Sequence, residues 1–126
     1  MDRIDRVSIV GMGAMGILYG DFFANALGRE QVTFLADSDR ARRYRNTPVY
    51  CNGRKMDFRI QDGAVPDSQG PAQLLLFAVK ATALGDAISV AGNQVGKDTV
   101  ILSVLNGITS EAVIGEALGM DHVLYC

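Results

Sequence analysis

The chain of 126 residues is long enough for one domain with its own hydrophobic core, and 48% hydrophobic with 21% charged residues is ordinary for a globular protein. Its formal net charge of −2 gives no reason to expect nucleic acid or an anionic membrane surface as a partner. The longest apolar run, Leu74–Val79, is too short to span a membrane.

The N-terminal part of the chain predicts a strand, a glycine loop and a helix in direct succession. Val7–Val10 is a β-like run, and Ala14–Leu27 has the apolar periodicity of a helix that stops at Gly28. The apolar residues expected on one face of this helix are Met15, Leu18, Phe22 and Ala26. We interpret Phe22, Phe23 and the methionines as core or helix-packing residues.

Strand and helix patterns continue to alternate along the rest of the chain. Further strands are expected at Gln31–Ala36, Leu74–Val79, Thr99–Leu105 and His122–Tyr125. Helices are expected at Ala81–Ala91 and Thr109–Leu118, and a short helix capped by Asp37 or Ser38 should end before Thr47-Pro48. A small β-hairpin is predicted from Val49-Tyr50-Cys51, the turn Asn52-Gly53 and the alternating Met56, Phe58 and Ile60.

Strands that are separated by helices imply a parallel sheet with right-handed crossovers. The predicted fold class is therefore α/β, with a Rossmann-type doubly wound, mostly parallel sheet and a small β-hairpin insertion. The sequence contains no internal repeat, and residues 1–126 are expected to form one dinucleotide-binding domain.

The glycine loop Gly11–Gly16 has the GxGxxG spacing of a dinucleotide-binding turn between strand and helix. In that arrangement Gly11 permits the tight turn, Gly13 lets a pyrophosphate approach the backbone, and Gly16 lets helix and strand pack closely. Amides at the helix start would hold the phosphates. Asp37 lies 21 residues after Gly16, close to the position expected for a ribose contact. The alternative is a tight turn that binds no ligand.

Polar residues at three other predicted strand ends could belong to the same site, because ligands lie at that edge of an open α/β sheet. Lys80 could contact phosphate, ribose or substrate, or it is a solvated lysine at a helix start. Asn106 could hydrogen-bond a ribose hydroxyl or a substrate carbonyl, or it only forms a turn with Gly107. Asp37 and Arg40 flank the end of the second strand.

Several other polar residues are interpreted as having no role in chemistry. His122, the only histidine, starts a predicted strand and so belongs to the opposite edge of the sheet. Cys51 and Cys126 suggest neither a disulfide framework nor a metal site. Arg42 and Arg45 are expected on a solvated helix face. The N-terminus shows no signal peptide, so a cytoplasmic protein is expected.

Four segments together resemble the N-terminal half of a ketopantoate reductase (2-dehydropantoate 2-reductase): GMGAMGILYG, FLADSDR, LLLFAVK and SVLNGITSE. The resemblance runs from about Val7 to Tyr125, and it implies reduction of 2-dehydropantoate to pantoate with NADPH, in pantothenate and coenzyme A synthesis. The residues that resemble the family's cofactor loop are Gly11, Met12, Gly13, Ala14, Met15 and Gly16. Lys80 resembles its cofactor-contacting lysine, and Asn106 the asparagine that cofactor ribose and substrate share.

The chain departs from the family pattern at two points. The family's NADP-binding arginine usually ends the second strand, where this chain has Ala36-Asp37, and Arg40 is the best substitute. Because an aspartate repels a 2′-phosphate, NAD is the alternative cofactor. The resemblance also places the catalytic lysine in a helical C-terminal catalytic and dimerisation domain that this chain lacks. No catalytic residue is therefore expected among the 126 residues, and the isolated chain is expected to be inactive.

The expected partners are the dinucleotide and a small keto-acid substrate, without nucleic acid or membrane, and a homo-oligomer is an open option. Among enzymes, the alternative is a related 2-keto-acid or imine reductase. Outside enzymes, the alternative is a non-catalytic dinucleotide-sensing module. A sensor has no need of substrate-facing polar groups such as Lys80 and Asn106, which favours the reductase.

Overall fold

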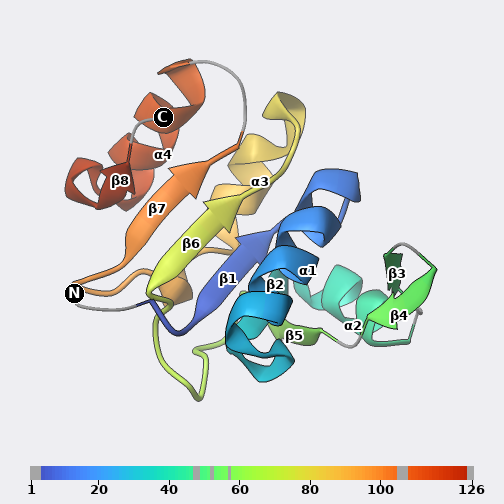
Figure 1. Cartoon of the computed structure of the whole chain (residues 1–126). Coiled ribbons are helices and arrows are strands. Elements are labelled where there is room, and N and C mark those ends of the chain that lie inside the picture. The colour runs from blue at the N-terminus through green and yellow to red at the C-terminus, as the bar shows by residue number, and fades with distance from the viewer. Residues whose placement is uncertain (1–3, 47–48, 52, 57, 105–107, 125–126) are drawn as a thin grey trace.

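The computed structural model describes residues 4–46, 49–51, 53–56, 58–104 and 108–124. Within these residues, six strands form one parallel sheet: β1 (Val7–Val10), β2 (Val32–Ala36), β5 (Arg59–Asp62), β6 (Leu74–Phe77), β7 (Val100–Ser103) and β8 (Val123–Leu124). Their order is β5-β2-β1-β6-β7-β8, and every neighbouring pair is parallel (Figure 1). The strand order reverses direction between β1 and β6, which confirms the predicted doubly wound α/β fold.

Helices cover both faces of this sheet. The described helices are α1 (Ala14–Leu27), α2 (Ser38–Asn46), α3 (Leu84–Ser89) and α4 (Ile108–Leu118). Helix α1 packs on one face against Ile9 and Phe34, whereas α3 and α4 pack on the other face against Val10 and Leu35. Strands β1, β2 and β6 are buried along their whole length, as expected for parallel strands that are covered on both sides.

The predicted apolar face of α1 is wrong. Three of the residues assigned to it are solvent-exposed: Met15 by 50%, Leu18 by 53% and Phe22 by 64%. The face that meets the sheet instead carries Gly16, Gly20 and Ala24. A Cβ on Gly20 would lie 2.8 Å from Cζ of Phe34, so the helix lies too close to the sheet for a larger side chain at this position.

The predicted hairpin is shorter than expected. Strands β3 (Val49–Cys51) and β4 (Arg54–Met56) form an antiparallel pair, but Ile60 lies in β5, which pairs with β2 in the main sheet. Phe58 and Ile60 both pack against the core on the α1 side. Their alternation therefore reflects burial in the main sheet and not a second hairpin strand.

Helix α4 begins one residue before its predicted range, Thr109–Leu118, whereas several other elements are shorter than predicted. The helix expected at Ala81–Ala91 is a 3-10 turn, Ala81–Ala83, followed by α3. Strands β6, β7 and β8 end earlier than expected, and residues 105 and 125 lie outside the described residues. No helix within the described ranges is both long and apolar enough to cross a membrane.

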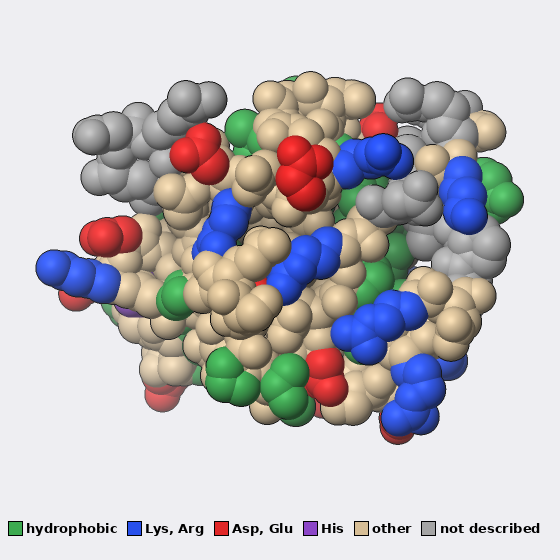
Figure 2. Space-filling view, turned by 90° about the horizontal axis from the view of Figure 1, so that it is seen from below, with side chains coloured by type: hydrophobic (Ala, Val, Ile, Leu, Met, Phe, Trp, Pro, Cys, Tyr) green, Lys and Arg blue, Asp and Glu red, His purple; other side chains and the backbone are tan. Residues whose placement is uncertain are grey.

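Charged side chains of both signs share the surface that Figure 2 shows, and Lys and Arg are most frequent on the side of α2. Arg42, Arg43 and Arg45 of this helix are exposed. Arg42 lies 3.9 Å from Asp39 with 74% of its side chain exposed, and Arg45 donates a hydrogen bond to the carbonyl of Ile60. The interpretation of Arg42 and Arg45 as a solvated helix face is confirmed.

Hydrogen bonds and an ion pair join Asp67, in the connection between β5 and β6, to the face of the sheet that α3 covers. Arg59 donates to both carboxylate oxygens of Asp67, at 2.6 and 2.8 Å, and also to Oγ1 of Thr33. Gln94 donates from Nε2 to Asp67 at 2.7 Å and accepts at Oε1 from the hydroxyl of Ser8. These contacts link β1, β2 and β5, so they hold the edge of the sheet in place.

Candidate functional site

Two glycines of the Gly11–Gly16 loop are required by the fold itself. Gly11 has φ +113°, and a Cβ there would lie 2.3 Å from the carbonyl oxygen of Ala78. A Cβ on Gly16 would lie 1.8 Å from the carbonyl oxygen of Gly11. The contact at Gly11 matches its expected role in the turn. Gly16 is required by the carbonyl of Gly11 within the loop, whereas Cβ of Ala78, the residue after β6, would lie at the ordinary contact distance of 3.7 Å.

Gly13 differs from both, because nothing within the described protein requires a glycine there. Its φ is −78° and its ψ −172°, which any residue adopts, and a Cβ would meet no atom within 4 Å. Gly13 is the N-cap of α1, and no side chain caps this helix by a hydrogen bond. The first amides of α1 and its positive dipole end therefore face an open backbone surface, which suits a phosphate group.

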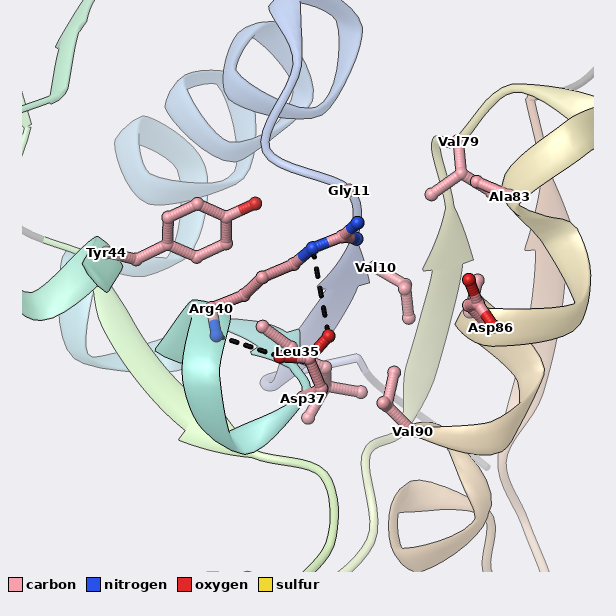
Figure 3. Close-up of a pocket in the computed structure, with 12 residues that line it drawn as sticks. Val10, Gly11, Leu35, Asp37, Arg40, Tyr44, Val79, Ala83, Asp86 and Val90 are labelled. Atoms are coloured by element: carbon pink, nitrogen blue, oxygen red, sulfur yellow. Dashed lines mark hydrogen bonds and ion pairs between the residues drawn. The ribbon is translucent and has the colours of Figure 1, made fainter. Parts of the chain in front are cut away.

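A hollow lies beside the loop, across the carboxyl ends of β2, β1 and β6 (Figure 3). Its lining residues are Val10, Gly11, Leu35, Ala36, Asp37, Arg40, Tyr44, Val79, Ala83, Asp86, Ala87 and Val90. The lining residues at the strand ends, among them Val10, Leu35 and Val79, are aliphatic. The charged lining residues lie beside or on the two helices that border the hollow: Asp37 and Arg40 at α2, and Asp86 in α3. Its position is the crevice at which an open α/β sheet binds its ligand.

Asp37 and Arg40 form one rim of this hollow. Asp37 precedes α2 and caps it, because its Oδ1 accepts the amide N–H of Arg40 at 2.8 Å. Its Oδ2 lies 3.7 Å from Nε of Arg40, and about half of each side chain is exposed. Figure 3 shows the Arg40 side chain extending over the hollow toward Gly11. The structure therefore places Arg40, which favours NADP, beside Asp37, which favours NAD.

The other residues considered in the sequence analysis are Lys80, Asn106 and His122. Lys80 is exposed and follows β6 at the edge of the sheet where the Gly11–Gly16 loop lies, but it does not line the hollow. Asn106 lies outside the described residues. His122 lies near the opposite edge, where its Nδ1 is 2.8 Å from the carbonyl oxygen of Thr99, the residue before β7.

Two polar residues of the hollow were missed by the sequence interpretation. Tyr44 follows Arg40 by one helical turn, and Asp86 lies in the first turn of α3, six residues after Lys80. The spacing i, i+4 from Arg40 could have indicated Tyr44. Asp86 shares one helical face with Ala83 and Val90, at spacings of three and four residues. The sequence alone does not indicate that this face turns toward the hollow.

Comparison with known proteins identifies the family of this chain. A model of the ketopantoate reductase PanE/ApbA family matches residues 7–126. Among solved structures, 2-dehydropantoate 2-reductase from Geobacter metallireducens GS-15 is 25% identical, with a TM-score of 0.70 over 94% of this chain and 39% of that chain. A D-mandelate dehydrogenase in complex with NADH and anilino(oxo)acetate is 21% identical, with a TM-score of 0.74 over the same shares.

A dimeric ketopantoate reductase from Staphylococcus aureus is 18% identical, with a TM-score of 0.65 over 95% of this chain and 40% of that one. The chain thus spans about two fifths of the length of these structures. The family match, by contrast, extends over nearly all of its own residues. The chain belongs to the ketopantoate reductase PanE/ApbA family.

Proposed function

We propose that this chain is the cofactor-binding half of a reductase that converts 2-dehydropantoate to pantoate with NADPH. The observation that carries the proposal is the open backbone at Gly13. The fold accounts for Gly11 and Gly16, but Gly13 has room for a side chain that only a bound ligand would exclude. A related 2-keto-acid reductase is the alternative, since D-mandelate dehydrogenase has the same fold.

The residues of the site fit an NADP dinucleotide. The amides that begin α1 would bind the pyrophosphate beside Gly13, and the hollow between α2 and α3 would take the adenosine. Lys80 and Asn106, which resemble the family's lysine and asparagine, would contact the cofactor and, for Asn106, the substrate. The nicotinamide, when bound, supplies the hydride.

Arg40 supports NADP over NAD. Its guanidinium extends over the hollow, where it could form charge-assisted hydrogen bonds with a 2′-phosphate. The Asp37 carboxylate already accepts the Arg40 amide and lies beside the Arg40 side chain, so part of its negative charge is compensated. NAD remains the second candidate, because an acidic residue at this strand end can accept the ribose hydroxyl.

Replacement of Arg40 by alanine tests this preference. NADPH binding should weaken about tenfold or more, because a hydrogen bond to a charged group is lost, whereas NADH binding should change little. Tighter binding of NADH than NADPH by the unaltered chain would instead assign NAD as the cofactor.

The chain alone is proposed to bind cofactor without turning over substrate. Hydride transfer to a ketone creates an alkoxide that needs a proton donor and electrostatic stabilisation. The resemblance to ketopantoate reductases implies that this donor is a lysine of a helical C-terminal domain, which would also form the dimer. An NADPH oxidation assay with 2-dehydropantoate checks this, and robust turnover by the 126-residue chain would contradict it.

The decisive experiment is calorimetric titration of the wild type and of Gly13→Val with NADPH and NADH. A Cβ at this position meets no atom within 4 Å, so the fold should be retained while dinucleotide binding is lost. Gly92→Val is the matched control, because Gly92 is also exposed with open space at its Cβ but lies outside the hollow. Equal affinity of the wild type and Gly13→Val would refute the proposal.

A further inference from the structure

The rim of the hollow opposite Arg40 is formed by α3, and Asp86 is its charged residue. Asp86 lies in the first turn of α3 and is exposed. Figure 3 shows its carboxylate on the side of α3 that faces α2 and Arg40 across the hollow. Its neighbours among the lining residues of this rim, Ala83, Ala87 and Val90, are aliphatic.

Asp86 is the acidic residue of the first turn of α3, where the helix dipole favours a negative charge. The hydroxyl of Ser89 donates to the backbone carbonyl of Asp86 at 2.6 Å, a contact that does not involve the carboxylate. Within the described residues no salt bridge joins it to Arg40, whose side chain lies beside Asp37. A ligand group placed in the hollow would therefore find an acceptor at this rim.

The chemistry of the hollow restricts what that ligand group can be. The aliphatic floor, which includes Val10 and Leu35, suits a flat ring with little polarity on its faces. The edge of the ring that reaches Asp86 must carry a hydrogen-bond donor, because an ionised carboxylate only accepts hydrogen bonds. Adenine has an amino group at position 6, whereas unsubstituted purine has only a hydrogen on carbon there and no hydrogen-bond donor on that edge.

We infer that Asp86 accepts a hydrogen bond from the 6-amino group of the adenine ring and so makes the site selective for adenine dinucleotides. The inference rests on the proposed function, since it assigns a base-recognition residue to the same cofactor site. Asp86 would then act in binding and specificity, remote from the nicotinamide end of the cofactor.

The test compares NADP with its purine analogue, nicotinamide purine dinucleotide phosphate, which lacks the 6-amino group, by calorimetric titration. The wild type should bind NADP about tenfold to a hundredfold more tightly than the analogue, as expected for one hydrogen bond to a charged group. In Asp86→Asn the ratio should fall to within about threefold, because a hydrogen bond to a neutral amide oxygen contributes less than one to a carboxylate. Asp98→Asn, an exposed change outside the hollow, should keep the wild-type ratio.

The ratio separates this inference from the proposed function. If the wild type binds both dinucleotides with equal affinity, or if Asp86→Asn keeps the full preference, the inference is wrong and the cofactor site stands. If the wild type binds neither dinucleotide, the proposed function fails and the inference fails with it. Circular dichroism of each variant establishes that it is folded before titration.

Discussion

Replacing Asp67 with alanine should lower the free energy of unfolding by about 3 kcal/mol, because it leaves the Arg59 guanidinium without its counter-ion. The Asp67 side chain is only 3% exposed and that of Arg59 24%. The carboxylate accepts two hydrogen bonds from Arg59, one from Gln94 and one from the amide of Gln69. Breaking a buried pair costs about 3–5 kcal/mol, and the partial exposure of Arg59 places the expected value at the lower end.

Urea denaturation followed by circular dichroism measures this loss, with linear extrapolation to water. Asp39→Ala is the matched control: its pair with Arg42 spans 3.9 Å, both side chains are largely exposed, and its removal should change stability little. Adding Arg59→Met to Asp67→Ala removes the unpaired charge and should recover part of the loss. A loss below about 1 kcal/mol in Asp67→Ala would refute the reasoning, because orphaned buried donors cost at least that much.

The same pair predicts a pH dependence of stability. Hydrogen bonds from Arg59 hold the pKa of the Asp67 carboxyl well below its usual value of about 3.9. A carboxyl whose pKa is depressed by folding contributes stability that is fully present above the unfolded pKa and is lost as the pH falls through the folded value. The difference in unfolding free energy between wild type and Asp67→Ala should thus be constant from about pH 7 to pH 5 and shrink below about pH 4.

Three further substitutions test other parts of the structure. Gly16→Ala should destabilise the chain by about 2 kcal/mol or more, since its Cβ would lie 1.8 Å from a backbone oxygen, and an unchanged thermal melting curve would contradict this. Glu111→Met should raise the unfolding free energy by about 1 kcal/mol, because Oε2 is buried without a hydrogen-bond partner within the described part of the chain. A stability loss in urea denaturation would show that this carboxylate is satisfied. Phe22→Gln should change stability by less than about 0.5 kcal/mol, since Phe22 is 64% exposed, and a loss above about 1.5 kcal/mol would show that Phe22 packs in the core.

Local chemistry explains which elements the sequence alone determined. The strand Val7–Val10 and the helix Ala14–Leu27 lie where they were predicted, because an apolar run, a glycine turn and the stop at Gly28 act within a few residues. The partner of Ile60 could not be determined in this way. Alternation shows that a strand has a buried face, but only the assembled sheet decides which strand lies beside it.

The inward face of α1 was also decided by tertiary structure. Hydrophobicity favoured Met15, Leu18 and Phe22, but helix and sheet approach so closely at Gly20 that a Cβ there would lie 2.8 Å from Phe34. Sequence spacing cannot measure that distance. Larger residues of α1 that do pack against the core are Tyr19, Phe23 and Leu27. A pattern of apolar residues therefore identified the helix correctly and its buried face incorrectly.

For the candidate site, the sequence alone determined the Gly11–Gly16 loop and the candidate Arg40, because both depend on fixed offsets from strand ends. Only the folded chain separated Gly13 from the glycines that the fold itself requires, since the space around a Cβ depends on residues far away in sequence. Only the tertiary structure likewise shows that Asp86 lines the hollow. Asp86 follows β6, and the crossover order of the sheet brings α3 opposite α2 across the end of β1.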